Sequence, residues 1–243
     1  MKIRDSVVLI TGAAQRVGRS VALSLAGHGA HIGFSYLSPD EPWAETLRDL
    51  KACGVQAHAV QADVTQVNQV RRLVDETITA LGHIDVLVNN ASVWLKKPVL
   101  EITEQEWDTA LTVNLKGPFL VSQMVARHMQ TRGNGLIINM TDLSAFQVWE
   151  GYAHHAASKA ALVALTKTMA LELAPTIRVN AIAPGTVLLP EGATDEKRAW
   201  AIDKSALKRV GSPEDVARTV RYLIEEDFAT GSVYFVDGGR SLM

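Results

Sequence analysis

The clearest chemical pattern in the sequence is a run of small residues directly after its first apolar segment. Residues 7–10 are Val-Val-Leu-Ile, and Thr11-Gly12-Ala13-Ala14-Gln15-Arg16-Val17-Gly18 follows. Where a strand turns into a helix, small residues let the backbone approach a pyrophosphate, which the free N–H groups of the helix then bind. Such a turn is also a common packing device. Its place as the first strand–helix turn of the chain favours dinucleotide binding.

A histidine and a lysine form a second candidate group. His155 and Lys159 stand four positions apart, so on a helix they share one face. An imidazole with an unperturbed pKa of about 6.5 has a proton to give near neutral pH. The Lys159 cation opposes a positive charge on the ring, whereas the carboxylate of Asp142 favours it. A general-acid role for His155 therefore stays open.

These residues need a scaffold, and short apolar segments alternating with longer amphipathic ones supply it. Strands are expected at residues 7–10, 30–34, 56–61, 86–88, 136–139, 178–182 and 232–236, and helices at 17–27, 43–53, 67–81, 104–129, 152–174 and 213–225. This alternation predicts a doubly wound α/β fold, a parallel sheet of about seven strands with helices on both faces. With no linker, repeat or shift in composition, residues 1–243 are expected to form one Rossmann-type domain.

One stretch lacks periodicity. Residues 184–196 mix Pro, Gly and charged side chains directly after a strand. A loop of this length is functional or mobile. We expect a substrate loop near residues 184–204, with an ordinary surface loop as the alternative.

Composition excludes several classes of function. The chain has 243 residues, 47% hydrophobic and 21% charged, with a formal net charge of −2. Such a balance argues against disorder and against nucleic-acid binding. The single cysteine, Cys53, cannot form an internal disulfide or a cysteine-based metal site, so we expect no metal and a reducing, cytoplasmic location. Residues 1–5 do not resemble a signal peptide, and no apolar run reaches the roughly 18 residues of a membrane span.

Five motifs together resemble a known family. In chain order they are Thr11-Gly12 with Gly18, Asn89-Asn90-Ala91-Ser92, Ser158-Lys159-Ala160-Ala161, Arg178-Val179-Asn180 with Pro184-Gly185, and Val236-Asp237-Gly238-Gly239. In this order and spacing they resemble the short-chain dehydrogenase/reductase family over nearly the whole chain. The resemblance implies a Rossmann fold, a nicotinamide cofactor, a small-molecule substrate and a homo-oligomer, commonly a tetramer.

Three residues narrow the resemblance to the pteridine reductases within that family. Arg16 stands where most relatives have glycine, Asp142 stands where most have serine, and Trp94 follows Ser92 by two positions. In pteridine reductases the matching aspartate helps to deliver protons to the pterin, and the matching aromatic residue stacks the pterin on the nicotinamide. Trp94 could equally meet a neighbouring subunit, and Asp142 could simply cap a turn.

The expected cofactor is NADP(H) rather than NAD(H). NAD sites carry a carboxylate near the end of the second strand, but here none precedes Asp40. Arg16 and Ser38 are the candidate ligands of the 2′-phosphate. The resemblance assigns Asp63 to adenine, although Asp there is also a favourable helix cap. The other cofactor-binding candidates are Thr11, Gly12, Val17, Gly18, Asn90, Ala91, Ser92, Lys159, Pro184 and Gly185.

The expected catalytic group departs from the family at one position. The family has a tyrosine four residues before Lys159 that protonates the substrate; here that residue is His155. The resemblance implies that Lys159 holds the nicotinamide ribose and that Asn114 orders a water molecule. Tyr152 lies about 10 Å from Lys159 along a helix, too far to replace the missing tyrosine. The resemblance implies that Tyr152, with Trp94 and Ser92, lines the substrate pocket.

The resulting hypothesis is an NADPH-dependent reductase acting on a C=N bond of a pterin-like substrate, with Asp142, His155, Lys159 and Asn114 as catalytic candidates. One alternative keeps the fold and changes the substrate to a carbonyl compound or an alcohol. Another is a cofactor-binding protein whose catalysis is impaired because the tyrosine is absent.

Overall fold

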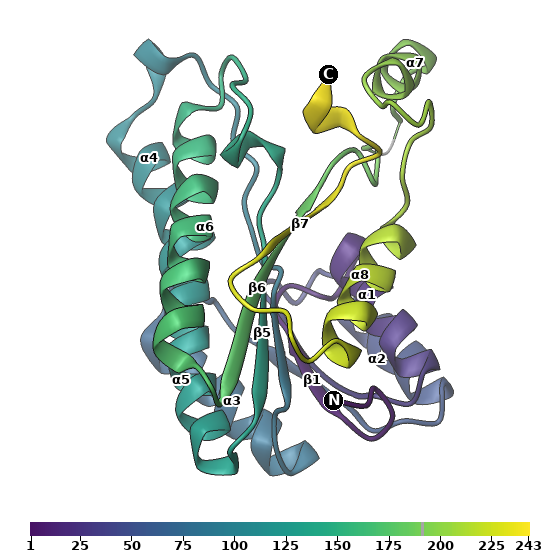
Figure 1. Ribbon diagram of the computed structural model, residues 1–243, viewed down its shortest axis with the longest axis vertical. Helices are drawn as coiled ribbons and strands as arrows, with labels where there is room; N and C mark the ends of the chain where they lie inside the picture. The colour runs from purple at the N-terminus through teal and green to yellow at the C-terminus, as the bar shows by residue number, and fades with distance from the viewer. Residues whose placement is uncertain (191) are drawn as a thin grey trace.

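A parallel β-sheet forms the centre of the molecule (Figure 1). The computed structural model describes residues 1–190 and 192–243, and in them the sheet has seven strands in the order β3-β2-β1-β4-β5-β6-β7. The strands are β1 (Val7–Ile10), β2 (His31–Tyr36), β3 (Ala57–Gln61), β4 (Val86–Asn89), β5 (Gly135–Met140), β6 (Ile177–Pro184) and β7 (Val233–Val236). The predicted doubly wound fold is confirmed. Because the strand order reverses between β1 and β4, the ligand crevice is expected at the carboxyl ends of these strands.

Helices cover both faces of the sheet. The described helices are α1 (Arg16–Gly27), α2 (Trp43–Ala52), α3 (Val67–Leu81), α4 (Glu104–Leu111), α5 (Gly117–Arg132), α6 (Ala153–Leu173), α7 (Asp195–Asp203), which lies beyond the strand ends, and α8 (Pro213–Glu225). Side chains of α1, α2 and α8 share one apolar core with the Val8 and Ile10 side chains of β1. Leu9 points to the other face, into a core with α3, α5 and α6. Because both faces are covered, all four residues of β1 are fully buried, which explains its unbroken apolar sequence.

The helix expected over residues 104–129 is interrupted. After α4, residues Thr112–Lys116 form a π-helical turn, and α5 then begins at Gly117. A Cβ on Gly117 would lie 2.9 Å from Val64 Cγ2, and Pro118 occupies the first turn of α5. Close packing and proline together favour the irregular backbone, which places Asn114 inside the π turn.

The predicted substrate loop near residues 184–204 contains a helix that the sequence pattern does not predict. Thr194 caps α7 by accepting a hydrogen bond from the Lys197 N–H, and two acidic residues lie in its first turn. The sequence contains this helix start signal. However, Ala201 is the only buried residue of the nine in α7, so the helix lacks the apolar periodicity by which helices are recognised. Residue 191 of the predicted substrate loop lies outside the described residues.

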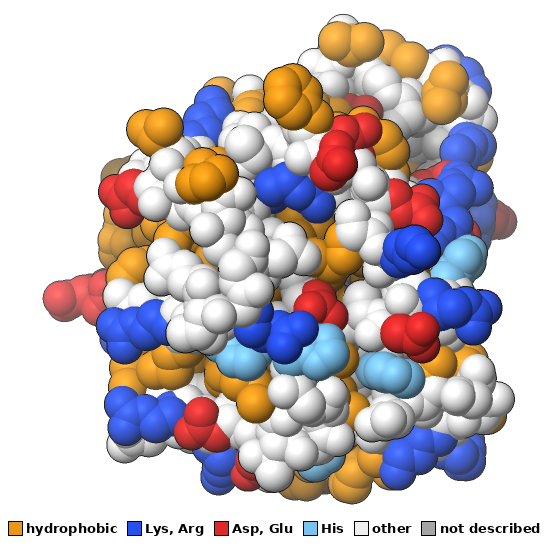
Figure 2. All heavy atoms as spheres, turned by 60° about the horizontal axis from the view of Figure 1, so that its bottom comes forward, with side chains coloured by type: hydrophobic (Ala, Val, Ile, Leu, Met, Phe, Trp, Pro, Cys, Tyr) orange, Lys and Arg blue, Asp and Glu red, His pale blue; other side chains and the backbone are white. Residues whose placement is uncertain are grey.

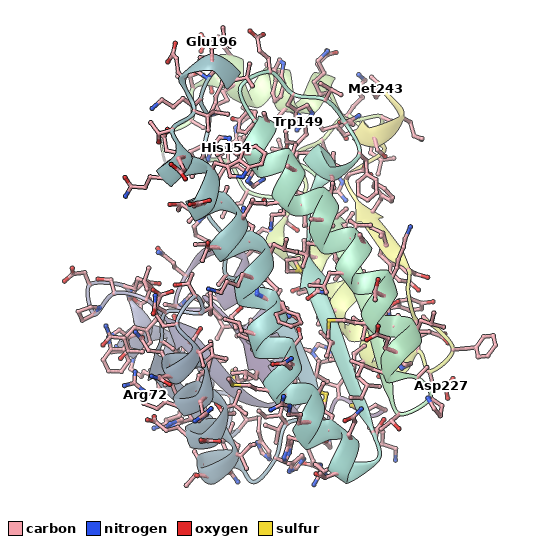
Figure 3. The ribbon with its side chains drawn as sticks, turned by 90° about the vertical axis from the view of Figure 1, so that its left-hand side faces the viewer. Arg72, Trp149, His154, Glu196, Asp227 and Met243 are labelled. Carbon is pink, nitrogen blue, oxygen red and sulfur yellow. The ribbon has the colours of Figure 1, made fainter. Side chains whose placement is uncertain are left out.

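The two ends of the sheet differ in character. Figure 2 turns the lower end of Figure 1 toward the viewer, and there cationic, anionic and histidine side chains are interspersed. At the upper end, where the strands finish, aromatic side chains including Trp149 lie near the start of α6 (Figure 3). Cys53 is exposed and unpaired, and no described helix is long and apolar enough to cross a membrane.

Candidate active site

The turn between β1 and α1 is locked against the end of β4. Asn90 Nδ2 donates to the carbonyl oxygens of Thr11 and Gly12, both at 2.9 Å. The Thr11 hydroxyl accepts from the N–H groups of Asn90 and Ala91 at 3.0 Å. A Cβ on Gly18 would lie 2.6 Å from Asn90 Nδ2 and 2.7 Å from the Gly12 oxygen. Only glycine fits at Gly18, so the turn keeps a narrow, backbone-lined cradle.

Arg16 begins α1 in an unusual backbone conformation. Its φ is 55°, in the left-handed region, where a residue with a Cβ pays a steric cost of roughly 1–2 kcal/mol. The residue is exposed, and no described carboxylate forms an ion pair with it. Gln15 provides no side-chain cap for α1, which leaves the first N–H groups of the helix available. A strained, unpaired arginine at a helix N-terminus suits an anionic ligand.

The carboxyl end of β2 carries a carboxylate that we had not considered. Glu41 Oε1 accepts hydrogen bonds from the N–H groups of Leu37 and Ser38, both at 2.8 Å. The Ser38 hydroxyl donates to Asp40 at 3.3 Å. A sequence rule that looks for an acid only at the strand end misses Glu41, which returns from the loop beyond Pro39. Ser38 is thus already engaged, and Arg16 is the freer of the two candidate phosphate ligands.

Asp63, at the end of β3, has a local partner. Its Oδ1 accepts from the Thr65 N–H at 2.9 Å, which forms an Asx turn; the N-cap residue of α3 is Gln66, so Asp63 is not the helix cap that the sequence also allowed. Its own N–H donates to Gln69 at 2.9 Å. The geometry therefore accounts for Asp63 without a ligand, although the residue stays at the ligand-facing end of the sheet.

Three of the candidate catalytic residues converge after β5. His155 Nε2 lies 2.7 Å from Asp142 Oδ2, and His155 Nδ1 lies 3.4 Å from Asn114 Nδ2. Asn114 Oδ1 accepts from the Val93 N–H and its Nδ2 donates to the Val93 oxygen, so the orientation of its amide is set. An NH₂ group therefore faces Nδ1 of His155, which makes Nδ1 the acceptor. The ring proton is then on Nε2, donated to Asp142.

His155 and Asp142 differ in how far they are exposed to solvent. The ring of His155 is fully buried, whereas the side chain of Asp142 is 15% exposed. Asp142 Oδ1 also accepts from the N–H and the hydroxyl of Ser144 in the turn Leu143–Ala145. Burial opposes ionisation of Asp142, but the hydrogen bond from His155 and the charge of Lys159 outweigh it and lower its pKa.

Lys159 lies one helical turn further along α6 and is buried. Its Nζ donates to the Met140 carbonyl at the end of β5, at 2.9 Å. Burial lowers the pKa of Lys159, and the negative charge of Asp142 acts in the opposite direction. The ammonium group is therefore held beneath the site by the strand end and Asp142 together.

Aromatic side chains form one wall of the site. The Trp94 ring lies 4.5 Å from the His155 ring and 5.0 Å from the Tyr152 ring, and its Nε1 donates to the Tyr152 hydroxyl at 3.2 Å. Trp149 packs against Trp94 with ring centres 5.8 Å apart. Trp94 is still 54% exposed, so about half of its surface stays free beside the His155 ring.

The loop after β6 borders the same end of the sheet. The Gly185 N–H donates to the Val236 oxygen at 3.0 Å, and a Cβ on Gly185 would lie 2.7 Å from Asp237 Cα. Glycine therefore lets the backbone after Pro184 pass close to the end of β7. Ser92 is exposed in the segment before Trp94. Arg16, Ser38 and Asp63 lie at the ends of earlier elements, on the β2 and β3 side of the crevice.

The fold and this crevice define a Rossmann-type protein, and comparison with known proteins gives its family. A family profile described as Enoyl-(Acyl carrier protein) reductase matches residues 12–241. The 3-oxoacyl-[acyl-carrier-protein] reductase FabG of Staphylococcus epidermidis is 36% identical over 236 residues, covering 95% of this chain and 97% of that protein. The chain belongs to the short-chain dehydrogenase/reductase family of oxidoreductases.

Further relatives are similar over the whole length. Subunit BbsD of a (2S)-[(R)-hydroxy(phenyl)methyl]succinyl-CoA dehydrogenase from Thauera aromatica is 34% identical over 250 residues, covering 100% of this chain and 99% of that protein. A dehydrogenase/reductase structure from Sinorhizobium meliloti has a TM-score of 0.92 at 31% identity, covering 98% of this chain and 96% of that chain. A 7α-hydroxysteroid dehydrogenase complexed with NADH and 7-oxo glycochenodeoxycholic acid has a TM-score of 0.93 at 30% identity, covering 98% and 95%.

Proposed function

We propose that the protein is an NADPH-dependent reductase that adds hydride to a C=N bond of a flat, pterin-like heterocycle. The observation that carries this proposal is the half-exposed indole of Trp94 against His155, whose other side contacts Asp142. An indole face binds a flat ring by stacking, and a carboxylate at its edge accepts hydrogen bonds from ring N–H groups. A simple ketone needs neither feature.

The residues of the phosphate turn fit a dinucleotide. Gly12 and Gly18 let the backbone of the turn pack closely on Ala91 and Asn90, and the uncapped start of α1 offers N–H groups to a pyrophosphate. Arg16 is placed to bind a 2′-phosphate, which favours NADPH over NADH. A reduced nicotinamide, when bound, supplies the hydride. Lys159 is assigned to its ribose.

The proton is assigned to Asp142, which His155 positions. Both ring nitrogens of His155 face protein groups and the ring is buried, so the substrate meets Asp142 first. As hydride adds to the carbon of the C=N bond, its electron pair moves to nitrogen. That nitrogen takes a proton that Asp142, which is 15% exposed, first accepts from solvent, and the product is CH–NH. His155 thus positions Asp142 and keeps its own ring proton.

A panel of substrates tests this function. NADPH oxidation is followed with dihydrobiopterin, dihydromonapterin and dihydrofolate, and with a matched set of ketones, aldehydes and 3-oxoacyl thioesters. We expect the pterins to give a kcat/KM at least tenfold above the carbonyl compounds. Absence of NADPH oxidation with all three pterins would overturn the proposal. The carbonyl compounds are the second candidate, favoured by the 36% identity to 3-oxoacyl-[acyl-carrier-protein] reductases.

Replacing His155 tests the impaired-enzyme alternative. His155→Tyr restores the residue type that the family resemblance expects, and His155→Phe serves as a control that removes the contact with Asp142. A positioned general acid contributes roughly 10²–10⁴-fold, so we expect the tyrosine variant to gain about 10²-fold over the natural chain. A loss in both variants would instead identify the histidine as the working group. Cofactor binding, followed by fluorescence quenching, should be unchanged in both.

A further inference from the structure

Arg240 near the C-terminus lies between two tryptophan rings. Its guanidinium carbon is 5.0 Å from the ring centre of Trp149 and 5.0 Å from that of Trp200. Its Nη1 donates to the Thr186 hydroxyl at 2.8 Å, and its carbonyl oxygen accepts from Gln147 Nε2 at 3.2 Å. One residue therefore joins the segment after β5, the loop after β6, helix α7 and the C-terminal turn.

Helix α7 buries little of its own surface. All nine of its residues are described, and Ala201 alone is buried; Trp200 is 49% exposed. Figure 1 shows α7 beyond the ends of the strands, apart from the two helix layers and near the C-terminus. The Ser205 hydroxyl and the Leu207 N–H bind the Gly238 oxygen, but these bonds hold the turn after α7.

The charge of Arg240 is offset by aromatic faces instead of a carboxylate. Among the residues that the structure describes, none forms an ion pair with its guanidinium. The nearby carboxylate of Asp237 accepts from the N–H groups of Gly239 and Ser241. Burial lowers the pKa of Arg240, and the charge of Asp237 opposes this shift. A partly buried guanidinium between two indoles is the arrangement in which cation–π attraction is strongest.

The same cation reaches the candidate reacting centre through aromatic contacts. Trp149, on one side of Arg240, lies 5.8 Å from Trp94, and Trp94 lies 4.5 Å from His155. Figure 3 shows Trp149, His154 and Glu196 of α7 at the same end of the molecule, with Met243 close by. A row of contacting side chains thus runs from Trp200 on α7 to His155.

We propose that Arg240 is a positioning residue that docks α7 beside the substrate site and holds Trp149 against Trp94. In this role it sets the shape of the substrate pocket, and it does not touch the reacting atoms. The proposal for the pocket rests on the proposed function, whereas the docking of α7 does not. Lysine in its place keeps the charge but loses the planar stack and the fork to Thr186, so Arg240→Lys is expected to be intermediate and Arg240→Met to be fully undocked.

Hydrogen exchange of the substrate-free protein tests the docking. In Arg240→Met we expect exchange of residues 195–203 to accelerate about tenfold, the loss expected from two cation–π contacts. Arg198→Met, a matched change at an exposed position of α7, should leave it unchanged. Trp200→Leu should reproduce the acceleration, and the Arg240→Met/Trp200→Leu double variant should add nothing to it. Unchanged exchange in Arg240→Met and Trp200→Leu, or fully additive effects, would overturn the docking.

Steady-state kinetics test the effect on the pocket. With whichever substrate class the protein reduces, Arg240→Met should raise the substrate KM about tenfold while kcat and the Kd for NADPH change less than threefold. Equal loss of kcat and of cofactor affinity would contradict a positioning role. If no substrate is reduced at all, the proposed function fails while the exchange experiment still decides the docking. Trp200→Leu provides the same comparison should Arg240→Met fold poorly.

Discussion

Two regions at the carboxyl end of the sheet are held in place in different ways. The β1–α1 turn is set by close approach, since a Cβ on Gly18 would meet backbone atoms at 2.7 Å and 2.9 Å. The candidate reacting centre after β5 is set by side-chain hydrogen bonds, in which His155 bridges Asp142 and Asn114. The side chain of Arg16 in the first region is exposed. The side chain of His155 in the second region is buried, and each of its ring nitrogens has a partner.

This difference shows which amino-acid substitutions each region tolerates. A sterically closed turn tolerates a new side chain only where it points to solvent, because elsewhere backbone atoms block it. A hydrogen-bonded centre tolerates a new side chain when each polar atom has a partner. The predictions below test these two rules.

The largest effect is expected at the phosphate turn. Gly18→Val places three heavy atoms where Asn90 and the Gly12 oxygen already lie, so the turn must move. A displacement of about 1 Å costs roughly 10²-fold in a positioned site, and overpacking costs about 1–3 kcal/mol of stability. We expect affinity for both nicotinamide cofactors to fall by at least that factor in a fluorescence titration. Gly27→Ala, where a Cβ would meet no atom within 4 Å, is the matched control and should bind normally.

At the reacting centre the expected effect depends on charge. Asp142→Asn keeps a hydrogen bond with His155 but removes the carboxylate, so kcat should fall roughly 10²-fold with an unchanged KM for NADPH. The charge of Asp142 raises the pKa of Lys159 against the lowering by burial. Its removal therefore moves the alkaline limb of the kcat profile to lower pH, because Lys159 then loses its proton earlier.

Ser144→Ala is the control for this variant. It removes one hydrogen-bond donor to the same carboxylate and leaves the charge, so kcat should fall less than tenfold and the alkaline limb should stay in place. An Asp142→Asn variant with full activity, or with an unmoved alkaline limb, would contradict the role given to the carboxylate.

The comparison also shows what local sequence patterns predict and what they miss. Buried strands such as β1 can be predicted from the sequence because both of their faces require apolar residues. The role of Gly12 and Gly18 can be predicted because the close approach of backbone segments leaves no room for larger residues. Sequence patterns do not predict the contact of Glu41 with Leu37 or the packing of Arg240 between two tryptophans. Each contact depends on where loops or distant segments of the chain meet. Helix α7 was missed because most of its surface faces solvent.

A moderate effect is expected at Arg16, whose strained backbone lowers stability while its side chain favours NADPH. Arg16→Gly relieves the left-handed conformation, so the free energy of unfolding should rise by about 1 kcal/mol. The same change removes the guanidinium, and the preference for NADPH over NADH should fall about tenfold. Arg16→Lys keeps a cation and the strain, so it should retain part of the preference and gain no stability. An unchanged cofactor preference in Arg16→Gly would mean that another group binds the 2′-phosphate.

The smallest effect concerns His154, the neighbour of His155 on α6, which has the opposite environment. Both ring nitrogens of His154 are buried without a hydrogen-bond partner among the described residues. Burial lowers its pKa, with the charge of His155 adding to the shift and that of Glu106 on α4 opposing it. Below about pH 6.5 His154 therefore binds a proton in the unfolded chain but not in the folded chain. The free energy of unfolding then decreases as the pH is lowered, by at most about 1.4 kcal/mol per pH unit.

His154→Leu should remove this acid sensitivity. Urea unfolding at pH 7.5 and pH 5.5 should show a smaller loss of stability for the variant than for the natural chain, whereas exposed His28→Leu should leave the difference unchanged. An equal acid loss in His154→Leu would contradict the role given to His154 and would point to His128, whose pKa burial also lowers.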